Sequence, residues 1–441
     1  MKKAFSIILT FILIISGIMP ASANGAPSVT AEAALLIDAT NGRVLFEKNA
    51  DKVMYPASTT KIMTALVALE AVAKGEISLD QPLVLSEAAN ATLDIDGSGI
   101  ALKVGEEMRL ENLLQGLLIA SGNDAAVCIA EGISGSIDAF VERMNEKAVK
   151  LKLKDTHFVN PHGLHDSEHR TTAKDLARLA TEAMKNETFR SIVECAHIYL
   201  PETNMSEKRY FINTNNLVSR MRYPYYFYDK ATGIKTGSTT EAGYCLVASA
   251  EDDGKSVISV ILKAEDIAVS HNESKALLEY GLNKFSLVEM VRKDDIVGEV
   301  GVKQAADGTD HILLAAEDSL EVLLSGKENK EKIETVIEVP EKVYAPIEIG
   351  QVVGKVKYVY EGQELGSANL VSTVKVKRHL LGFLMSFGEW LWSFRTVKVI
   401  VFTVLALVLG FVILVFIGLV RAVKKSKRKK RRTTRYTPPR Y

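Results

Sequence analysis

Three short motifs within one stretch of the chain carry the residue types that acyl transfer by a serine requires. They are Ser58-Thr59-Thr60-Lys61, Ser121-Gly122-Asn123 and Lys235-Thr236-Gly237. In the first motif Ser58 and Lys61 are one helical turn apart, so the lysine amine can reach the serine hydroxyl. A lysine is a useful base only when its pKa falls well below ~10.4, which burial and a second nearby lysine both promote. The first motif therefore predicts a nucleophile and its base.

The apolar pattern that follows Ser58 argues against an ordinary explanation of this motif. Taken alone, a serine at a helix start followed by an exposed lysine is common. Here apolar residues occupy most sides of the helix from Ile62 onward, which predicts that the helix is buried. Because lysine is rarely buried without a partner, a buried Lys61 is expected to have a functional role or a paired group.

Ser121-Gly122-Asn123 lies between apolar helical patterns at 113–119 and 125–130 and is therefore a tight loop. We expect Ser121 to relay a proton between a lysine and the leaving amine, and Asn123 to orient a substrate amide. Taken alone, the motif is explained equally well as a helix-linking turn whose serine or asparagine caps the next helix.

Lys235-Thr236-Gly237 precedes an apolar strand pattern, which places the motif at or near a sheet edge. Gly237 removes a side chain that would block an extended peptide, so a substrate could add itself there as a strand. Lys235 and Thr236 would then hold its terminal carboxylate, and backbone N–H groups of Ser58 and Ser238 would form an oxyanion hole. A glycine turn between strands is the ordinary alternative.

Strand patterns at both ends of residues 28–285 enclose a run of helical patterns. Hairpins are predicted at 34–46 and 244–262, each with a glycine-containing turn. Helical periodicity covers residues 61–72, 110–119, 124–131, 137–151 and 172–184. This order predicts an α+β domain in which the two chain ends form one antiparallel sheet, a helical cluster is inserted between them, and a last helix at 274–285 packs on the sheet.

A second, smaller domain is predicted at residues 290–378. Short alternating apolar runs, punctuated by glycine and asparagine, are typical of an all-β module and occur at 312–314, 321–324, 336–339 and 352–357. The module contains no recognisable arrangement of nucleophile and base, so we assign it no catalysis.

The N-terminus has the order of a secretory signal peptide. Residues 1–23 run from Lys2-Lys3 through a short apolar stretch to Ala21-Ser22-Ala23. A membrane helix is the alternative, but the apolar core is short and the small-residue end suits cleavage. We expect the mature chain to start near Asn24.

The C-terminal region predicts a single membrane span. The 22 residues 399–420 are apolar or glycine except for Thr403, which is enough to cross ~30 Å of hydrocarbon as a helix. Residues 421–441 hold eleven Lys or Arg and no acidic residue, which predicts a cytoplasmic tail and an extracytoplasmic position for residues 24–398. An apolar stripe with both tryptophans at 379–394 predicts an interfacial amphipathic helix, with a core helix of the β module as the alternative.

Charge and cysteine content narrow the possible partners. The chain has 54 basic and 54 acidic residues, but without the two lysines of the signal and the eleven basic residues of the tail, 41 basic residues remain against 54 acidic ones. An acidic exported region argues against nucleic acid as a partner.

Cys128, Cys195 and Cys245 are too few and too scattered for a disulfide framework, so stability must come from a core.

Four histidines crowd one segment and raise the question of a metal: His157, His162, His165 and His169. Their spacing lacks the i, i+4 pair with an intervening glutamate that a zinc helix carries. The segment also contains Pro161 and Gly163, and a serine mechanism needs no metal. We therefore expect no metal and no cofactor.

The three motifs, in this order and spacing, resemble those of the penicillin-recognising serine acyl-transferases. More specifically, they are similar to the serine-type D-alanyl-D-alanine carboxypeptidases, which are low-molecular-mass penicillin-binding proteins. Residues 158–164, residues 239–244 and the trailing β module share the resemblance, so it covers nearly all of residues 24–398. It implies a β-lactamase/transpeptidase-like first domain. Many relatives end in an amphipathic helix alone, whereas this chain adds a full span.

The resemblance also implies roles for individual residues. Ser58 is the nucleophile that becomes the acyl-enzyme, and Lys61 is its base. Ser121 and Asn123 form the second motif, and Lys235 is the substrate-binding lysine.

The implied reaction is removal of the terminal D-alanine from peptidoglycan stem pentapeptides that end in D-Ala-D-Ala, and β-lactam antibiotics such as penicillin are the implied covalent inhibitors. Three alternatives remain open. A transpeptidase would pass the acyl group to an amine, a β-lactamase would deacylate fast, and a wall-binding scaffold would be catalytically silent. The signal and the anchor restrict any substrate to the outer membrane face, where stem peptides occur.

Overall fold

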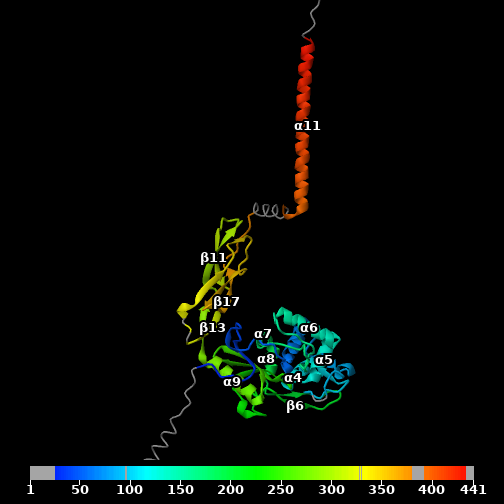
Figure 1. The fold of residues 1–441 in the computed structure, drawn as a ribbon, viewed down its shortest axis with the longest axis vertical. Coiled ribbons are helices and arrows are strands. Elements are labelled where there is room, and N and C mark those ends of the chain that lie inside the picture. The colour runs from blue at the N-terminus through cyan, green and yellow to red at the C-terminus, as the bar shows by residue number, and fades with distance from the viewer. Residues whose placement is uncertain (1–24, 95–96, 327, 329, 380–391, 434–441) are drawn as a thin grey trace, which may run out of the picture. The chain divides into compact units, whose positions relative to one another are not determined.

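The computed structural model describes residues 25–94, 97–326, 328, 330–379 and 392–433 (Figure 1). The predicted signal peptide at 1–23, most of the predicted interfacial segment and the end of the predicted tail lie outside the described residues. The chain forms two compact units. The first extends to Met290 and adds Leu320–Thr335 and Lys357–Ser367; the second comprises Val291–Ser319, Val336–Val356 and the residues from Ala368 onward.

One five-stranded sheet in the first unit is built from strands far apart in the chain. Its order is β2-β1-β9-β8-β7, and its neighbouring strands are antiparallel. The bounds are β1 (Ala33–Asp38), β2 (Val44–Lys48), β7 (Ala231–Thr239), β8 (Gly243–Asp252) and β9 (Lys255–Ala264). β1 pairs with β9, with Leu35 opposite Val260. The predicted α+β fold and both hairpins are therefore confirmed, and β7 lies at the sheet edge.

The two faces of this sheet pack against two different hydrophobic cores. Leu35 of β1 packs with the helical cluster, whereas its neighbour Leu36 packs on the other face together with Leu277 and Leu278. Successive residues of a strand point to opposite faces, so a strand buried on both sides is apolar without alternation. This explains the continuous apolar runs of β8 and β9.

Helices cover both faces, and most of them agree with the periodicity. The helical cluster comprises α2 (Lys61–Ala73), α3 (Glu87–Asn90), α4 (Leu110–Ile119), α5 (Asn123–Ser134), α6 (Ile137–Lys150), α7 (Ala173–Ala183) and α8 (Glu187–Val193). The five predicted helices of the cluster are confirmed to within three residues at each end. α2 is buried nearly all round, as its composition predicts.

The last helix of this unit begins earlier than its apolar pattern indicates. α9 (Ile267–Lys284) starts at Ile267 rather than at 274, so the predicted start is wrong. The Asp266 side chain caps this helix by accepting a hydrogen bond from the Val269 N–H at 2.7 Å. The cap defines the start, because the first two turns carry no periodic apolar residues that could show it.

Several short elements were not predicted. They include the helices α3 and α8, and the 3-10 helices η1 (Ala57–Thr60) and η2 (Pro224–Tyr226). The strand pairs β3 (Pro82–Val84) with β4 (Glu107–Arg109) and β5 (His197–Leu200) with β6 (Arg209–Ile212) were not predicted either. Each is too short to show a period in the sequence.

The remaining strands confirm an all-β region after α9. A six-stranded sheet has the order β14-β16-β17-β12-β11-β15, and β10 pairs separately with β13. The bounds are β10 (Phe285–Val291), β11 (Ile296–Lys303), β12 (His311–Ala316), β13 (Leu320–Ser325), β14 (Glu334–Glu338), β15 (Lys342–Tyr344), β16 (Val352–Tyr360) and β17 (Gln363–Ser372), with the short 3-10 helix η3 (Lys330–Lys332). The domain limits 28–285 and 290–378 stay predictions.

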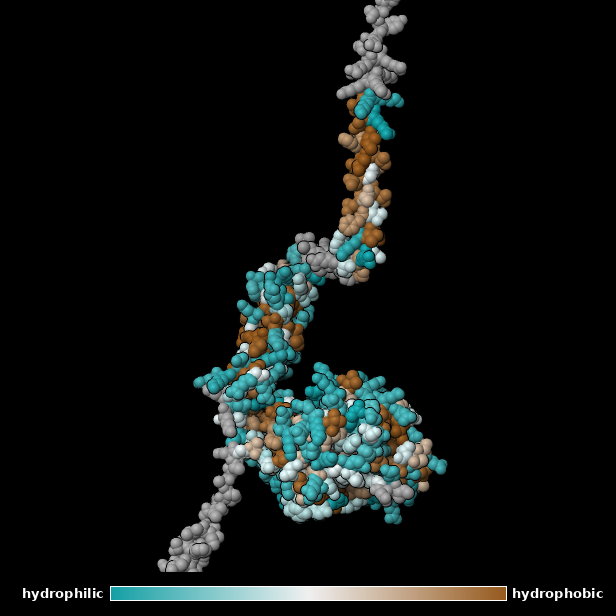
Figure 2. All heavy atoms as spheres, viewed as in Figure 1, coloured by the Kyte–Doolittle hydropathy of each residue, from teal (hydrophilic) through white to brown (hydrophobic). Residues whose placement is uncertain are grey.

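A long apolar helix, α11 (Arg395–Thr433), ends the described chain. Among the described residues, Arg395–Lys425 is the one helix whose length and composition suit a membrane span, and none of its most apolar window is buried. Figure 2 shows apolar residues along this helix on the face in view. Exposed apolar surface of this extent marks an interaction site, and the predicted span at 399–420 lies within it.

Candidate active site

Ser58 lies in the 3-10 turn η1, directly before helix α2. The preceding residue, Ala57, has a φ of +48°, in the left-handed region that a non-glycine residue adopts only at a cost. The Thr59 and Thr60 hydroxyls donate to the carbonyls of Pro56 and Ala57 at 2.7 and 2.8 Å. Local hydrogen bonds thus hold a strained turn that presents a half-buried Ser58.

The Lys61 amino group lies against Ser58. Its Nζ is 2.9 Å from Ser58 Oγ, 2.7 Å from Asn123 Oδ1 and 2.7 Å from the His162 carbonyl oxygen. The side chain is fully buried. Burial and the nearby Lys235 charge hold the pKa of Lys61 well below its ordinary value, although Asp124 acts in the opposite direction. A lysine in this state can accept a proton near neutral pH.

The loop that contributes the His162 carbonyl depends on a glycine. Gly163 has a φ of +89°, and a Cβ there would lie 1.9 Å from the Ala57 carbonyl oxygen. Only glycine therefore allows this loop to pack against η1.

The histidines of this segment make structural contacts. Burial lowers the pKa of His162 to about 3 and that of His169 to about 4, so both rings are neutral at pH 7. His169 Nε2 lies 2.8 Å from Thr60 Oγ1, and the His165 ring packs edge-on against Tyr55. In the part of the chain that the structure describes, no group of three or more His, Cys, Asp or Glu side chains is placed to hold a metal.

The Ser121-Gly122-Asn123 loop joins α4 to α5 beside Lys61. Ser121 has a φ of +62°, and Asn123 begins α5, with its N–H donating to the Ser98 carbonyl at 2.8 Å. Asn123 also accepts the Lys61 hydrogen bond described above. The Ser121 side chain lines the same pocket as Ser58, but it has no hydrogen-bond partner among the described residues.

Lys235 and Thr236 lie on the edge strand β7. Lys235 is fully buried, its Nζ donates to the Thr236 carbonyl at 3.0 Å, and burial lowers its pKa to about 7. The Thr236 hydroxyl donates to Thr214 Oγ1 at 2.7 Å. β7 therefore brings a second weakly basic lysine and a hydroxyl to the site.

The structure shows a requirement for Gly237 in addition to the expected one. A Cβ there would lie 2.9 Å from the Ser58 nitrogen, 3.0 Å from the Thr59 nitrogen and 3.1 Å from the Pro56 oxygen. These are backbone atoms, which cannot move aside cheaply. The close approach that the glycine allows is thus between β7 and η1, the turn that carries Ser58.

A pocket of about 180 Å³ brings most of the predicted residues together. It is lined by Ser58, Ser121, Thr236, Gly237 and Ser238, while Lys61, Asn123 and Lys235 lie buried next to it. Sequence reasoning did not assign the other residues of its lining to the site, among them Ser98, Thr214, Arg222 and His271. These four come from four separate segments without a motif, so only the tertiary fold could reveal them.

Asp124 fixes the wall of the site next to Asn123. Its carboxylate accepts hydrogen bonds from the Ile100 N–H at 2.9 Å and the Leu102 N–H at 3.0 Å. Glycines allow this contact, since a Cβ at Gly99 would lie 3.0 Å from Asp124 Oδ2. The segment that contains Ser98 is therefore held against the start of α5.

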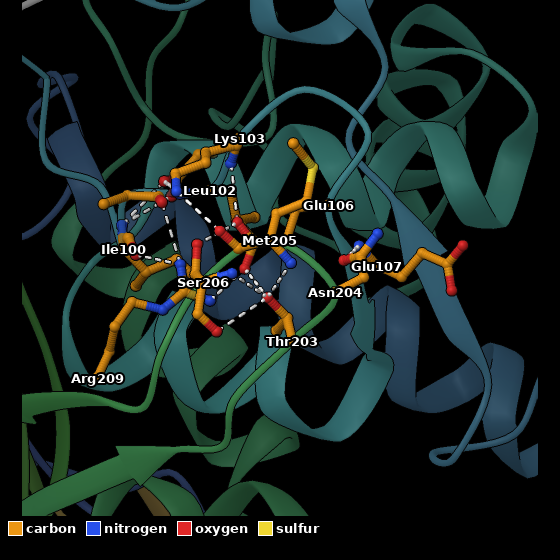
Figure 3. Close-up of polar contacts among 12 residues, drawn as sticks. Ile100, Leu102, Lys103, Glu106, Glu107, Thr203, Asn204, Met205, Ser206 and Arg209 are labelled. Carbon is orange, nitrogen blue, oxygen red and sulfur yellow. Dashed lines mark hydrogen bonds and ion pairs between the residues drawn. The ribbon is translucent and has the colours of Figure 1, made fainter.

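A second buried carboxylate, Glu106, holds the same segment from its other end (Figure 3). Glu106 is fully buried and accepts hydrogen bonds from Arg209 at 2.5 Å and from the Thr203 hydroxyl at 2.7 Å. Arg209 in turn donates to the Ile100 and Ala101 carbonyls at 2.9 and 3.0 Å. Burial alone would raise the pKa of Glu106, but these hydrogen bonds and the Arg209 charge hold it below its ordinary value.

Two family models match this chain. The family model described as D-alanyl-D-alanine carboxypeptidase matches residues 20–266, and the model described as penicillin-binding protein 5, C-terminal domain, matches residues 285–378. The chain is 38% identical to the D-alanyl-D-alanine carboxypeptidase DacF of Bacillus subtilis over 274 residues, which cover 62% of this chain and 68% of that protein.

Two further relatives cover most of the chain. The D-alanyl-D-alanine carboxypeptidase DacA of Haemophilus influenzae is 32% identical over 374 residues, 84% of this chain and 91% of that protein. The crystal structure of penicillin-binding protein 5 from Haemophilus influenzae matches with a TM-score of 0.68 at 29% identity, covering 80% of this chain and 99% of that one. With its serine, two buried lysines and edge strand arranged as described, this chain belongs to the family of D-alanyl-D-alanine carboxypeptidases.

Proposed function

We propose that this protein removes the C-terminal D-alanine from peptidoglycan stem pentapeptides ending in D-Ala-D-Ala, through an acyl-enzyme on Ser58. The observation that carries the proposal is the 2.9 Å contact between Ser58 Oγ and the buried Lys61 Nζ, whose pKa lies well below its ordinary value. A neutral amine at hydrogen-bond distance from a hydroxyl is the arrangement that activates a serine nucleophile.

The acylation step begins when the Lys61 amine takes the proton of Ser58 Oγ as this oxygen bonds to the carbonyl carbon of the penultimate D-alanine. The backbone N–H groups of Ser58 and Ser238 stabilise the resulting oxyanion. The C–N bond then breaks, and the leaving amine of the terminal D-alanine receives a proton through Ser121. The position of Ser121 in the same pocket supports this relay.

Water completes the cycle by adding to the acyl carbon of the ester. The bond between this carbon and Ser58 Oγ breaks and one proton of the water returns to Ser58 Oγ. The other proton passes to solvent as the shortened peptide leaves as a carboxylate. β-Lactam antibiotics acylate Ser58 in the same way, and the reaction then stops at a stable acyl-enzyme.

Substrate binding uses the free edge of β7. An extended peptide adds there as a further strand, with its terminal carboxylate held by the charged form of Lys235 and by the Thr236 hydroxyl. Asn123 orients the amide that precedes the scissile bond. Gly237 and Ser238 form the part of the edge that lies beside the reacting carbonyl.

The proposed location is the outer face of the cell membrane. The signal peptide exports the chain, α11 anchors it in the lipid bilayer, and the basic tail stays in the cytoplasm. The apolar surface of α11 and the run of Lys and Arg after it support this topology.

Release of D-alanine tests the proposal directly. The detergent-solubilised full chain should release D-alanine from a peptide ending in Lys-D-Ala-D-Ala, and Ser58→Ala and Lys61→Ala should not. Absence of release by the unmodified chain would contradict the assignment. A product joined to an added amine would favour the transpeptidase alternative, and rapid turnover of penicillin would favour the β-lactamase.

A further inference from the structure

Three chain segments meet at one end of the six-stranded sheet: 303–306, 344–350 and 372–378. The Ala345 N–H donates to the Lys303 carbonyl at 3.0 Å, and the Ala306 N–H donates to the Lys377 carbonyl at 2.8 Å. All three segments belong to the second unit. The chain passes from this end at Arg378 toward the predicted membrane span, so this end of the β region precedes the span directly along the chain.

Apolar side chains are exposed at this end, on a surface that we call the end surface. Its apolar members are Tyr344, Pro346, Ile349 and Val374. The tyrosine is 58% exposed, the isoleucine 68% and the valine 42%. Ile347 is fully buried and bridges to Val376, which brings two of the segments side by side and gives them their own core contact. Exposed apolar side chains that gather from two segments in this way mark a contact site.

The same end is basic, although the predicted exported region is acidic as a whole. The three segments and the adjoining turn carry four cations and two carboxylates: Lys303, Lys375, Lys377, Arg378, Asp307 and Glu348. Lys375 pairs with Glu348 at 2.7 Å, and Lys303 Nζ lies 5.9 Å from the centre of the Tyr344 ring. Lys303 and Lys377 are exposed and complete the end surface. A tyrosine and lysines side by side are typical of the headgroup layer of a membrane.

The length of chain between the end surface and α11 keeps this surface close to the bilayer. α11 begins at Arg395, 17 positions after Arg378. A connection of this length spans ~25 Å as a helix and at most ~60 Å when fully extended. If α11 crosses the bilayer, the end surface therefore stays within that reach of the headgroups, and the predicted interfacial segment at 379–394 begins at the residue after Arg378.

We propose that the end surface docks on the headgroup layer of an anionic bilayer. Tyr344 and Ile349 insert among the headgroups, and Lys303 and Lys377 lie against lipid phosphates. Each cation near an anionic surface favours the contact about fivefold. The contact is weak on its own and depends on the tether, which makes it intramolecular. This inference rests on the proposed anchoring by α11 and gives the β region a second, reversible contact with the same membrane.

Quenchers carried by lipid headgroups test the contact in the full chain. A fluorophore is attached to the variant Ile349→Cys in a Cys195→Ser background, because Cys128 and Cys245 are buried. In vesicles of phosphatidylcholine and phosphatidylglycerol, its fluorescence should fall about threefold more than in phosphatidylcholine alone. The matched control is Ile296→Cys, at a 55% exposed isoleucine that lies seven strand positions, or ~24 Å, from Lys303 along β11. Equal quenching at both positions, or none at either, would overturn the inference.

Charge variants separate headgroup docking from other contacts. Lys303→Gln combined with Lys377→Gln should reduce quenching in the anionic vesicles to the level of the neutral ones. Lys293→Gln, at an exposed lysine just before β11, is the control and should change nothing. Unchanged quenching in the double variant, or disulfide-linked pairs of the Ile349→Cys chain in place of quenching, would overturn the inference. A chain that does not enter vesicles at all would instead contradict the proposed anchor, and the inference with it.

Discussion

At the scale of single residues, the proposed mechanism gives two buried lysines different roles in one site. Lys61 contacts the Ser58 hydroxyl, whereas Lys235 lies on β7 and donates to the Thr236 carbonyl. Burial lowers the pKa of both, and the Lys235 charge lowers that of Lys61 further. The chain can therefore hold one lysine neutral as a base and the other charged as a carboxylate-binding group at the same pH.

The pH dependence of acylation follows from these two roles. Acylation needs neutral Lys61, so the rate rises as pH increases through the lowered pKa of Lys61. Acylation also needs charged Lys235, so the rate falls as pH increases through the Lys235 pKa of about 7. We expect a bell-shaped profile for penicillin acylation with a descending midpoint of about 7. In Lys235→Arg, whose guanidinium stays charged, the descending limb should disappear. A rate that climbs steadily into alkaline pH in the unmodified chain would contradict the assigned roles.

At the scale of elements, the proposed mechanism depends on how closely the edge strand β7 approaches η1. Gly237 permits this approach, and Gly163 permits that of the His162 loop on the other side of the same turn. Two glycines from distant segments thus fix the strained turn that carries Ser58. Positions of this kind tolerate no side chain, because the atoms that a Cβ would meet belong to the backbone.

Gly237→Ala should disturb the nucleophile more than the fold. Its Cβ would lie 2.9 Å from the Ser58 nitrogen, so the turn must shift, and a shift of this order costs about a hundredfold in rate. Penicillin labelling of Ser58 measures the effect. Gly298→Ala, in strand β11, is the control because its Cβ would find the nearest atom at 3.6 Å. Unchanged labelling of the Gly237 variant would show that the approach is not needed.

Glu106→Gln should destabilise the first unit by about 3 kcal/mol, because it leaves Arg209 without its charged partner in a buried site. The pKa of Glu106 is lowered in the folded state, so its contribution is present above the ordinary carboxyl pKa and is lost as pH falls through the folded value. Urea unfolding at pH 7 and pH 4 measures both effects. Glu107→Gln, at the exposed neighbour, should leave the midpoint unchanged. A Glu106 variant as stable as the parent at pH 7 would contradict the account.

Long elements and motifs could be predicted from the sequence, whereas contacts between distant segments could not. The helix that begins at Lys61 and the edge position of Lys235 follow from apolar patterns that reflect burial. The His162 carbonyl that holds Lys61 could not be predicted, because a backbone atom leaves no trace in residue type. Arg222 and His271 reach the pocket only through the tertiary fold. The early start of α9 depends on one cap, Asp266.

At the scale of the whole molecule, the chain consists of two regions that match known families, followed by an apolar helix. The carboxypeptidase match ends at residue 266 and the C-terminal domain match at residue 378, so α11 lies beyond both. Its exposed apolar surface supports the proposal that α11 anchors the chain in a bilayer.

Truncation before α11 tests the role of this helix as an anchor. The full chain should stay in the membrane fraction after alkaline extraction. A chain ending at Arg378, which also lacks the predicted interfacial segment at 379–394, should appear in the medium with its penicillin labelling intact. A C-terminal tag on the full chain should be protected from protease added to intact cells. Cleavage of that tag, or membrane retention of the truncated chain, would contradict the proposed topology.

The central claim is that Ser58 is the residue that becomes acylated. Peptide mapping by mass spectrometry after brief incubation of the full chain with penicillin tests it most directly. The account predicts one penicilloyl adduct on the peptide that contains Ser58, no adduct in Ser58→Ala and little in Lys61→Gln, because Lys61 Nζ lies 2.9 Å from the attacking oxygen. An adduct on Ser121, or an adduct that persists in Ser58→Ala, would contradict it.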